Sequence, residues 1–178
     1  MIKDTTPYGN RNLSLLDKKS VTYENRAASM TLNCPSNPRL TTLVLVFNLS
    51  MDAGTNLQYR PNNNTANMKS YVHEVGEWGW GQNRHTSIIH NGPALVGMLG
   101  GESIRRNEVA GMATLYPPQS GTYYGRRKVI CDYSIGDSEG EARVTSSIMW
   151  ADIATPITSI VLTRTGNFWG EVELYKVE

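Results

Sequence analysis

The stretch Thr155-Pro-Ile-Thr-Ser-Ile-Val-Leu-Thr-Arg-Thr-Gly-Asn-Phe-Trp-Gly-Glu-Val-Glu-Leu-Tyr-Lys-Val177 decides the fold of this chain. It contains two apolar, β-branched runs separated by Thr165-Gly-Asn167, whose glycine and asparagine favour a turn. Val172 and Leu174 alternate with glutamates, so a strand here has one apolar face and one polar face. The stretch therefore predicts two strands joined by a turn, which close a β-sandwich.

Alternating patterns upstream predict further strands of the same kind. Each has apolar residues at every second position, which is typical of a strand with one buried face. The predicted buried positions are Ala28, Met30 and Leu32, then Val129, Cys131, Tyr133 and Ile135, then Val144, Ile148 and Trp150. The opposite face of the 128–135 strand carries Lys128, Asp132 and Ser134. We therefore predict an all-β, antiparallel β-sandwich with very little helix.

The run Leu43-Val-Leu-Val-Phe47 is apolar at every position. A strand tolerates this pattern when both of its faces are covered. The run is predicted to be either a central core strand or a strand at a subunit interface.

The amino-acid composition limits the kinds of partner that this chain is expected to bind. The chain has 178 residues, enough for one domain with its own core. Its 17 Lys and Arg nearly balance its 16 Asp and Glu, so it lacks the positive field that would attract nucleic acid or anionic lipid. No secretory or membrane-spanning segment is recognisable. The two cysteines, Cys34 and Cys131, are predicted to be reduced core residues of a chain made in the cytoplasm.

Residues 1–25 differ from the rest because they are polar and rich in turn-forming residues. Their apolar anchor is Leu13-Ser-Leu-Leu16, which makes Leu13, Leu15 and Leu16 candidate contact residues. We predict an extended N-terminal arm over residues 1–25 that lies on another surface, and a sandwich domain over residues 26–178.

No residue cluster predicts catalysis or a cofactor. His73-Glu74 with Glu77 lacks the second histidine of a zinc protease motif. Gly100-Gly-Glu-Ser103 is not the Gly-x-Ser-x-Gly turn that exposes a serine nucleophile. The protein is therefore expected not to be an enzyme and to hold no metal or cofactor.

Two further features are candidates for binding. Trp78 and Trp80 lie in a glycine-rich segment, where aromatic side chains can cover an end of the sandwich, contact a protein partner, or stack on a glycan. Gly125-Arg-Arg-Lys128 places Arg126 and Arg127 at the start of a strand. These arginines are predicted to form a solvated edge, with a contact to an acidic neighbour as the alternative.

A family resemblance rests on segments of the last third. Ile157-Thr-Ser-Ile160, Gly166-Asn-Phe168 and Leu174-Tyr175 follow one another in an order that resembles the end of a group of tailed-bacteriophage virion structural proteins. Leu43–Phe47 and the tryptophan-bearing run Ile148-Met-Trp150 are similar to upstream strands of that group. The likeness covers residues 27–178, although residues 71–108 match no named feature of the group.

The resemblance implies a jelly-roll-like module of a phage surface, of the capsid decoration, head fibre or tail-tip type, often a homotrimer. The expected function is that of a virion structural protein, preferably a capsid decoration or cementing protein bound to the major capsid protein or another virion protein. The alternative is a tail, baseplate or fibre protein that recognises a host glycan. The protein would be assembled in the host cytoplasm and reside in the virion.

Overall fold

The computed structural model describes residues 12–34, 41–52, 57–66, 68–78, 82–90, 92, 94–96, 106–118, 127–136, 140–152 and 155–178. Within these residues the chain is all-β, with antiparallel strand pairs and no helix. The eleven strands are β1 (Leu13–Val21), β2 (Ala27–Asn33), β3 (Leu43–Asp52), β4 (Leu57–Pro61), β5 (Met68–Trp78), β6 (Gln82–His90), β7 (Ala94–Val96), β8 (Arg106–Tyr116), β9 (Arg127–Gly136), β10 (Gly140–Trp150) and β11 (Ser159–Val177).

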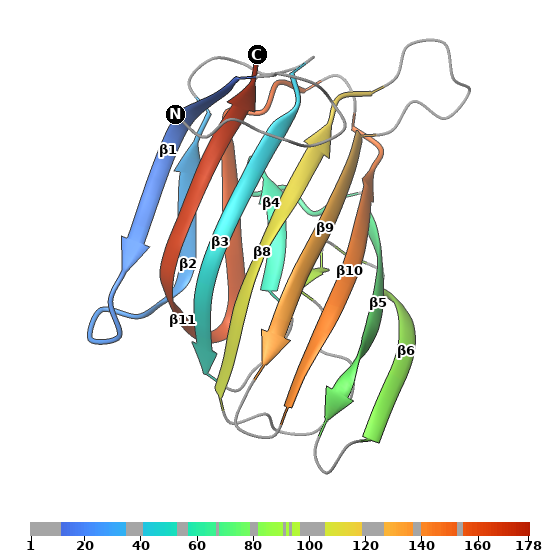
Figure 1. The fold of residues 1–178 in the computed structure, drawn as a ribbon. Helices are drawn as coiled ribbons and strands as arrows, with labels where there is room; N and C mark the ends of the chain where they lie inside the picture. The colour runs from blue at the N-terminus through green and yellow to red at the C-terminus, as the bar shows by residue number, and fades with distance from the viewer. Residues whose placement is uncertain are drawn as a thin grey trace.

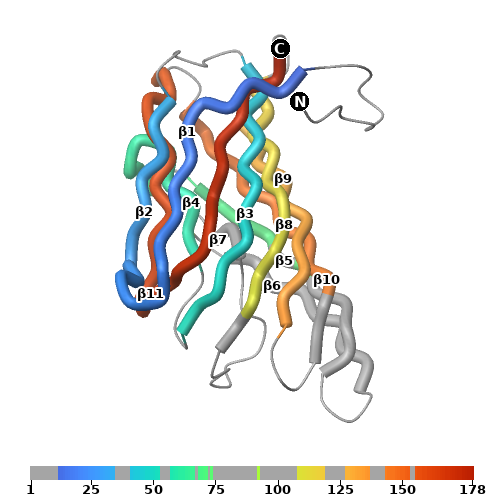
Figure 2. The backbone as a smooth tube through the Cα atoms, turned by 60° about the vertical axis from the view of Figure 1, so that its left-hand side comes forward, coloured from blue at the N-terminus to red at the C-terminus, as the bar shows by residue number. Residues whose placement is uncertain are grey.

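The strands are hydrogen-bonded in the order β6-β5-β10-β9-β8-β3-β11-β4-β7, and β1 and β2 also pair with β11. Strand β11 connects two groups of strands. Its second half pairs with β1 and β3, and its first half pairs with β2 and β4. In Figure 1, β2 and β4 lie behind the strands that run from β1 to β6, and Figure 2 shows the same separation from the side. We call β1, the second half of β11, β3, β8, β9, β10, β5 and β6 the front strands, and the others the rear strands.

Residues 155–177 were expected to form two strands joined by a turn, and this prediction is wrong. The two halves of β11 form one 19-residue strand, and each half bonds to different neighbours. Gly166 (φ 98°) and Gly170 (φ 123°) adopt backbone angles that favour glycine, and the β11–β2 register shifts between Thr163 and Phe168. The chain therefore bends at Gly166–Gly170 and passes from the rear strands to the front strands.

The strands on either side of β11 follow the same course. β1 and β2 together run antiparallel to the whole of β11, and β3 and β4 do so on its other side. Together with β11 these strands form a three-stranded ribbon, which folds back on itself at its lower end in Figure 1.

The core lies between the front and rear strands. Buried residues alternate along β9 as predicted, with Val129, Cys131, Tyr133 and Ile135 buried and Lys128, Asp132 and Ser134 exposed. The predicted buried positions of β10 and of the end of β11 are confirmed, as are Met30 and Leu32 of β2, whereas Ala28 is exposed. Cys34 and Cys131 are buried and unpaired, which confirms the prediction of reduced core cysteines.

Strand β3 is central, because it lies between β11 and β8. Its inward residues, Leu43, Leu45, Phe47, Leu49 and Met51, are all buried. On its outer face Val44 is buried, but Val46 is 37% exposed. The prediction of a central strand is confirmed, and the described chain leaves part of its outer face uncovered.

The predicted N-terminal arm is wrong for residues 13–21. These residues form β1, which pairs with β11 along its length. Leu16 alternates with the exposed Leu15 and packs against the core. A bulge between Leu15 and Asp17 brings Asp17 opposite Leu174, and the Asp17 carboxylate accepts a hydrogen bond from the backbone N–H of Asn33 in β2, at 2.8 Å. The sheet incorporates these residues because β11 would otherwise present an unpaired edge. Residues 1–11 lie outside the described residues.

Candidate interaction surface

The outer face of the front strands carries most of the exposed apolar surface. Seven large hydrophobic side chains are exposed in the described chain, and six of them occupy outward positions of the front strands: Leu15, Val46, Tyr71, Met112, Ile130 and Met149. The local reason is strand alternation. Each of Val46, Ile130 and Met149 lies between two buried residues, so its side chain must point outward.

Five of these side chains form one continuous line. Val46 of β3 pairs directly with Met112 of β8. On the other side of β8, Met112 pairs with Asp132 of β9, which is two residues from Ile130, so Met112 and Ile130 are diagonal neighbours. Ser147 of β10 pairs with Ile130. Met149 lies two residues further along β10, and Tyr71 of β5 pairs with Ser147 from the other side, so both continue the line. Long side chains at such diagonal positions reach one another. We call Val46, Met112, Ile130, Met149 and Tyr71 the apolar stripe.

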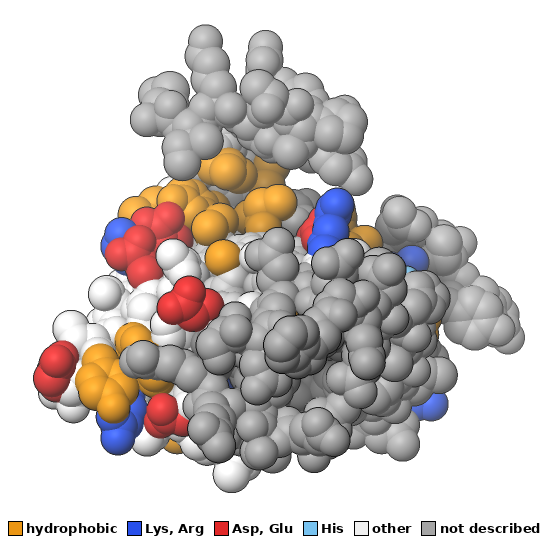
Figure 3. Space-filling view, turned by 60° about the horizontal axis from the view of Figure 1, so that its bottom comes forward, with side chains coloured by type: hydrophobic (Ala, Val, Ile, Leu, Met, Phe, Trp, Pro, Cys, Tyr) orange, Lys and Arg blue, Asp and Glu red, His pale blue; other side chains and the backbone are white. Residues whose placement is uncertain are grey.

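Charged side chains border the apolar stripe on both sides. Met149 lies between Lys128 and Lys69, which are exposed and form no ion pair within the described residues. On the other side, Asp132 of β9 accepts a hydrogen bond from Nε of Arg143, at 3.1 Å. This bond holds the pKa of Asp132 below its ordinary value. Figure 3 shows a hydrophobic area in its upper part with acidic and basic side chains on both sides, and a smaller hydrophobic group beside charged side chains at the lower left.

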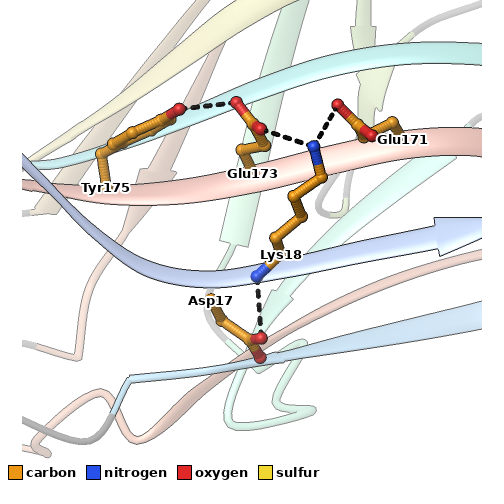
Figure 4. Close-up of polar contacts among 5 residues, drawn as sticks. All are labelled: Asp17, Lys18, Glu171, Glu173 and Tyr175. Carbon is orange, nitrogen blue, oxygen red and sulfur yellow. Dashed lines mark hydrogen bonds and ion pairs between the residues drawn. The ribbon is translucent and has the colours of Figure 1, made fainter. Parts of the chain in front are cut away.

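A polar cluster limits the same face at its β1–β11 border (Figure 4). The Lys18 ammonium lies 2.7 Å from Glu171 and 2.9 Å from Glu173, and the Tyr175 hydroxyl donates to Glu173 at 2.6 Å. The Tyr175 and Lys18 hydrogen bonds lower the pKa of Glu173, and the bonds to Glu171 and Glu173 raise the pKa of Lys18. The charges at this border are therefore paired within the chain.

The structure separates the three leucines predicted as contacts. Leu15 is 53% exposed on the outer face, opposite Tyr175. Leu16 packs against the core, and Leu13 is partly buried opposite Val177. Of the three, Leu15 presents the most apolar surface to solvent.

Arg127 is not part of a solvated edge, so that prediction is wrong. The inward positions of β9 begin at Arg127, and β9 is an internal strand between β8 and β10. Only 1% of Arg127 is exposed, its guanidinium lies 4.8 Å from the ring centroid of Trp150, and it donates to the carbonyl of Thr155 at 2.7 Å. Arg126 lies outside the described residues.

The two predicted tryptophans lie where the described chain is interrupted after β5. Trp78 is the last residue of β5, where it pairs with Gly140 of β10 and Gln82 of β6. The side chain of Trp78 and the whole of Trp80 lie outside the described part of the chain.

A second patch at the bend of the ribbon was not foreseen. The ring of Tyr23 meets that of Trp169 edge to face at 5.0 Å between centroids, and the guanidinium of Arg26 lies 4.8 Å from the Tyr23 centroid. Arg26 also pairs with Asp52 at 3.5 Å. We call Tyr23, Arg26, Asp52 and Trp169 the corner cluster. No local pattern in the sequence predicts it, because its members come from three distant segments that only the bend brings together.

The apolar stripe, by contrast, left a signal in the sequence. Ile130 interrupts the polar series Lys128, Asp132 and Ser134 on the outward face of β9. Met149 does the same after Arg143, Thr145 and Ser147 of β10, and Met112 lies between Ala110 and Thr114 on the outward face of β8. An apolar residue at a polar position of one strand is ordinary, but the same feature on neighbouring strands, in register, makes a surface.

Two other kinds of feature are absent from the described chain. Among the residues that the structure describes, no three His, Cys, Asp or Glu side chains lie together in a way that could hold a metal ion. In the same residues there is no helix of the length and apolarity needed to cross a membrane.

Comparison with known proteins adds little. No protein family matches the chain, and no curated protein matches it. Among solved structures, a chain from "Structure of infectious bursal disease virus Gt strain" shows 10% identity and a TM-score of 0.10. The alignment covers 95% of this chain and 42% of that one, so this chain spans less than half of its length. At that TM-score the likeness carries no argument about fold or function.

Proposed function

We propose that this chain is a virion structural protein that works through protein–protein contacts, and that it is a capsid decoration protein bound to the outer surface of the shell. The observation that carries the proposal is the apolar stripe, which crosses five neighbouring strands of a broad sheet face and is bordered by charges of both signs. Exposed apolar patches of this kind mark binding surfaces in soluble proteins. The resemblance of the last third to phage virion proteins supports the choice of a virion.

The finer fold assignment belongs to the same proposal. A jelly-roll-like β-sandwich is supported by the position of β2, β4 and the first half of β11 behind the front strands, and by the buried residues that both groups direct toward each other. Such modules present a wide sheet face while their loops remain free for attachment.

Copy number in purified virions tests the role. Quantitative mass spectrometry would give the ratio of this chain to the major capsid protein. A ratio near one, or a fixed large fraction of it, is expected for a protein that decorates the whole lattice. A few copies per particle would contradict decoration, and absence from virions would overturn the virion assignment.

Attachment to shells tests the part of the predicted arm that remains. Because residues 13–21 belong to the sheet, the informative truncation removes residues 1–11 alone. The truncated protein is expected to fold and to lose binding to undecorated shells in a sedimentation assay. Full binding by the truncated protein would show that residues 1–11 are not the attachment segment.

The corner cluster favours a second candidate, a tail or fibre protein that binds a host glycan. Tyr23 is 48% exposed, and sugars are bound by aromatic faces beside charged groups such as Arg26 and Asp52. Glycan-array binding that is abolished by Tyr23→Ala and Trp169→Ala would support this candidate. Binding abolished only by Trp78→Ala and Trp80→Ala would move the glycan site to the predicted tryptophan segment, and no glycan binding at all would remove the candidate.

A further inference from the structure

We infer that the outer face of the front strands binds the same face of a second copy of this chain, with a two-fold axis that crosses β9 at Ile130. The inference depends on the outer face alone and holds whether or not the protein belongs to a virion. The partner is therefore identical to the protein itself, and each copy presents the same apolar stripe and the same charged borders.

The charges on β9 have the symmetry that such a contact requires. The outward residues of this strand are, in order, Lys128, Ile130 and Asp132, so that a cation and an anion flank an apolar residue. A two-fold axis in the plane between the two faces, running across β9 at Ile130, exchanges the two sides. It brings Ile130 against Ile130 of the partner subunit and Lys128 against Asp132 of the partner subunit, twice per contact.

The charged groups beside Ile130 can form these pairs. Lys128 forms no ion pair within the described residues, so its charge is available. Asp132 already accepts from Arg143, but an ionised carboxylate has several acceptor positions and can accept from a lysine as well. One border is positive at Lys69 and Lys128, and the other carries the Asp132 carboxylate, so an axis at Ile130 sets the cation of one copy against a carboxylate of the other.

The apolar stripe also fits its own copy. It crosses the proposed axis at Ile130, and each of its members lies within two residues of the axis along its strand, so the two-fold rotation lays the two stripes across each other. Ile130 (50% exposed) would then be buried against Ile130 of the partner subunit, and Met112 (43% exposed), which pairs with Asp132, would be buried against Tyr116 of the partner subunit, which pairs with Lys128. The partly exposed outer face of β3 would be covered by the same contact, as the fully apolar run Leu43–Phe47 requires.

The face is large enough for a stable contact. Five strands spaced about 4.8 Å apart, each about ten residues long at about 3.3 Å per residue, span roughly 24 by 33 Å. This is about 800 Å² on each copy, the size of a standard interface between two proteins.

Two charge reversals test both the contact and its symmetry. Lys128→Glu places a carboxylate against Asp132 of the partner subunit, and Asp132→Lys places an ammonium group against Lys128 of the partner subunit. Each variant alone is expected to associate with itself at least about tenfold more weakly than the wild type, because like charges then meet twice. A 1:1 mixture of the two variants is expected to form a mixed dimer. In that dimer, position 128 of each variant faces a residue of opposite charge at position 132 of the other.

The measurement is sedimentation equilibrium of the full chain over a range of concentrations, with native mass spectrometry to identify the mixed species. Ile130→Asp serves as an independent variant that places charge at the axis, and it is expected to be monomeric. Glu24→Lys, a charge reversal at an exposed residue of the β1–β2 turn, is the matched control and should dimerise like the wild type. Circular dichroism and thermal unfolding establish that each variant is folded.

A monomeric wild type at high micromolar concentration would overturn the inference. So would a folded, dimeric or trimeric Ile130→Asp variant, or charge-reversal variants that remain monomeric when mixed. Copy number in virions does not enter these outcomes, so a failure of the dimer is distinguishable from a failure of the proposed function.

Discussion

Two arginines are buried in the described part of this protein, and their surroundings differ. Arg127 packs on Trp150 and donates to the carbonyl of Thr155. Arg164 of β11 is 6% exposed, and within the described residues none of its three guanidinium nitrogens has a hydrogen-bond partner. Burial lowers the pKa of Arg164, with the charge of Asp52 acting in the opposite direction. A buried cation without hydrogen bonds costs free energy, whereas one with good partners can contribute.

Substitution of these arginines by methionine should therefore have opposite effects. Arg164→Met keeps much of the apolar stem and removes the unsatisfied guanidinium, so the free energy of unfolding should stay the same or rise by about 1–4 kcal/mol. Arg127→Met, the matched variant, should lower it by about 1–3 kcal/mol through loss of the bond to Thr155 and the contact with Trp150. Urea unfolding measures both. A strongly destabilised Arg164→Met protein would mean that Arg164 has a stabilising partner in solution.

Asp17 joins the front and rear strands through a titratable group. Burial raises the pKa of its carboxyl, but hydrogen bonds from the backbone N–H groups of Asn33 and Lys18, with the charge of Lys19, lower it by more, so the net pKa is below the ordinary value. A carboxyl with a lowered pKa in the folded state stabilises the fold above its unfolded pKa, about 4. That contribution is lost as the pH falls through the lower, folded pKa.

Asp17→Asn should remove this part of the pH dependence. The variant should be less stable than the wild type at pH 7, and its stability should fall less as the pH is lowered from about 5 to about 2. Urea midpoints at several pH values test this, with Glu24→Gln as a control at an exposed carboxylate of the adjacent turn. Parallel pH profiles for the wild type and Asp17→Asn would show that the link between β1 and β2 does not depend on the charge.

At the scale of single strands, β8 shows how a missing side chain lets aromatic residues meet. Gly111 pairs with Phe47 of β3 on one side and with Tyr133 of β9 on the other, and the two rings lie 6.5 Å apart between centroids. A Cβ atom at Gly111 would collide with the Cβ of Tyr133 and come within 2.5 Å of the carbonyl oxygen of Asp132. Backbone and a buried side chain leave it no room.

Gly111→Ala should consequently destabilise the protein by at least about 2 kcal/mol, as overpacking of a core does. The control is Ala110→Gly at the neighbouring outward position, which changes the same strand by one methyl group and should cost about 1 kcal/mol or less. Thermal and urea unfolding compare the two. A cost at Gly111 no larger than that at Ala110 would mean that β8 and β9 can separate locally.

Strands with a clean period of two were the predictable elements. β9 and β10 follow from alternation, and they pair with each other as antiparallel neighbours. The pairing of β11 did not follow, because Gly166-Asn167 has the composition of a hairpin turn whether the two halves bond to each other or to separate neighbours. Composition specifies a change of direction, but the partners are strands near the beginning of the chain, which no local pattern identifies.

At the scale of the whole molecule, the chain before β1 and β1 itself have different roles. Removal of residues 1–11 should leave the unfolding midpoint unchanged. Removal of residues 1–21 takes away β1 and the packing of Leu16 and Val21 on the core, and exposes the edge of β11. That truncation should lose at least about 2 kcal/mol of stability and aggregate at higher concentration. Urea unfolding and light scattering compare the two, and equal stability would contradict the integration of β1 into the sheet.

The candidate site was predictable only in part. Leu15 was predicted as a contact residue and lies exposed on the outer face, but Leu16 packs partly buried against the core, because adjacent residues of a strand point to opposite faces. Arg127 was predicted at the surface, since charge normally excludes a residue from a core. The apolar stripe required the register of five strands, which no local pattern of residues specifies.

The course of β11 has a consequence for how the protein is made. Four strands that are translated early, between residues 13 and 61, all pair with residues 159–177. A nascent chain on the ribosome therefore cannot complete this sheet until residue 177 has emerged, so the early strands keep unpaired edges until then. We expect ribosome-bound chains that stop before β11 to be sensitive to proteases and to recruit chaperones, and the emergence of β11 to be the step that commits the chain to its fold.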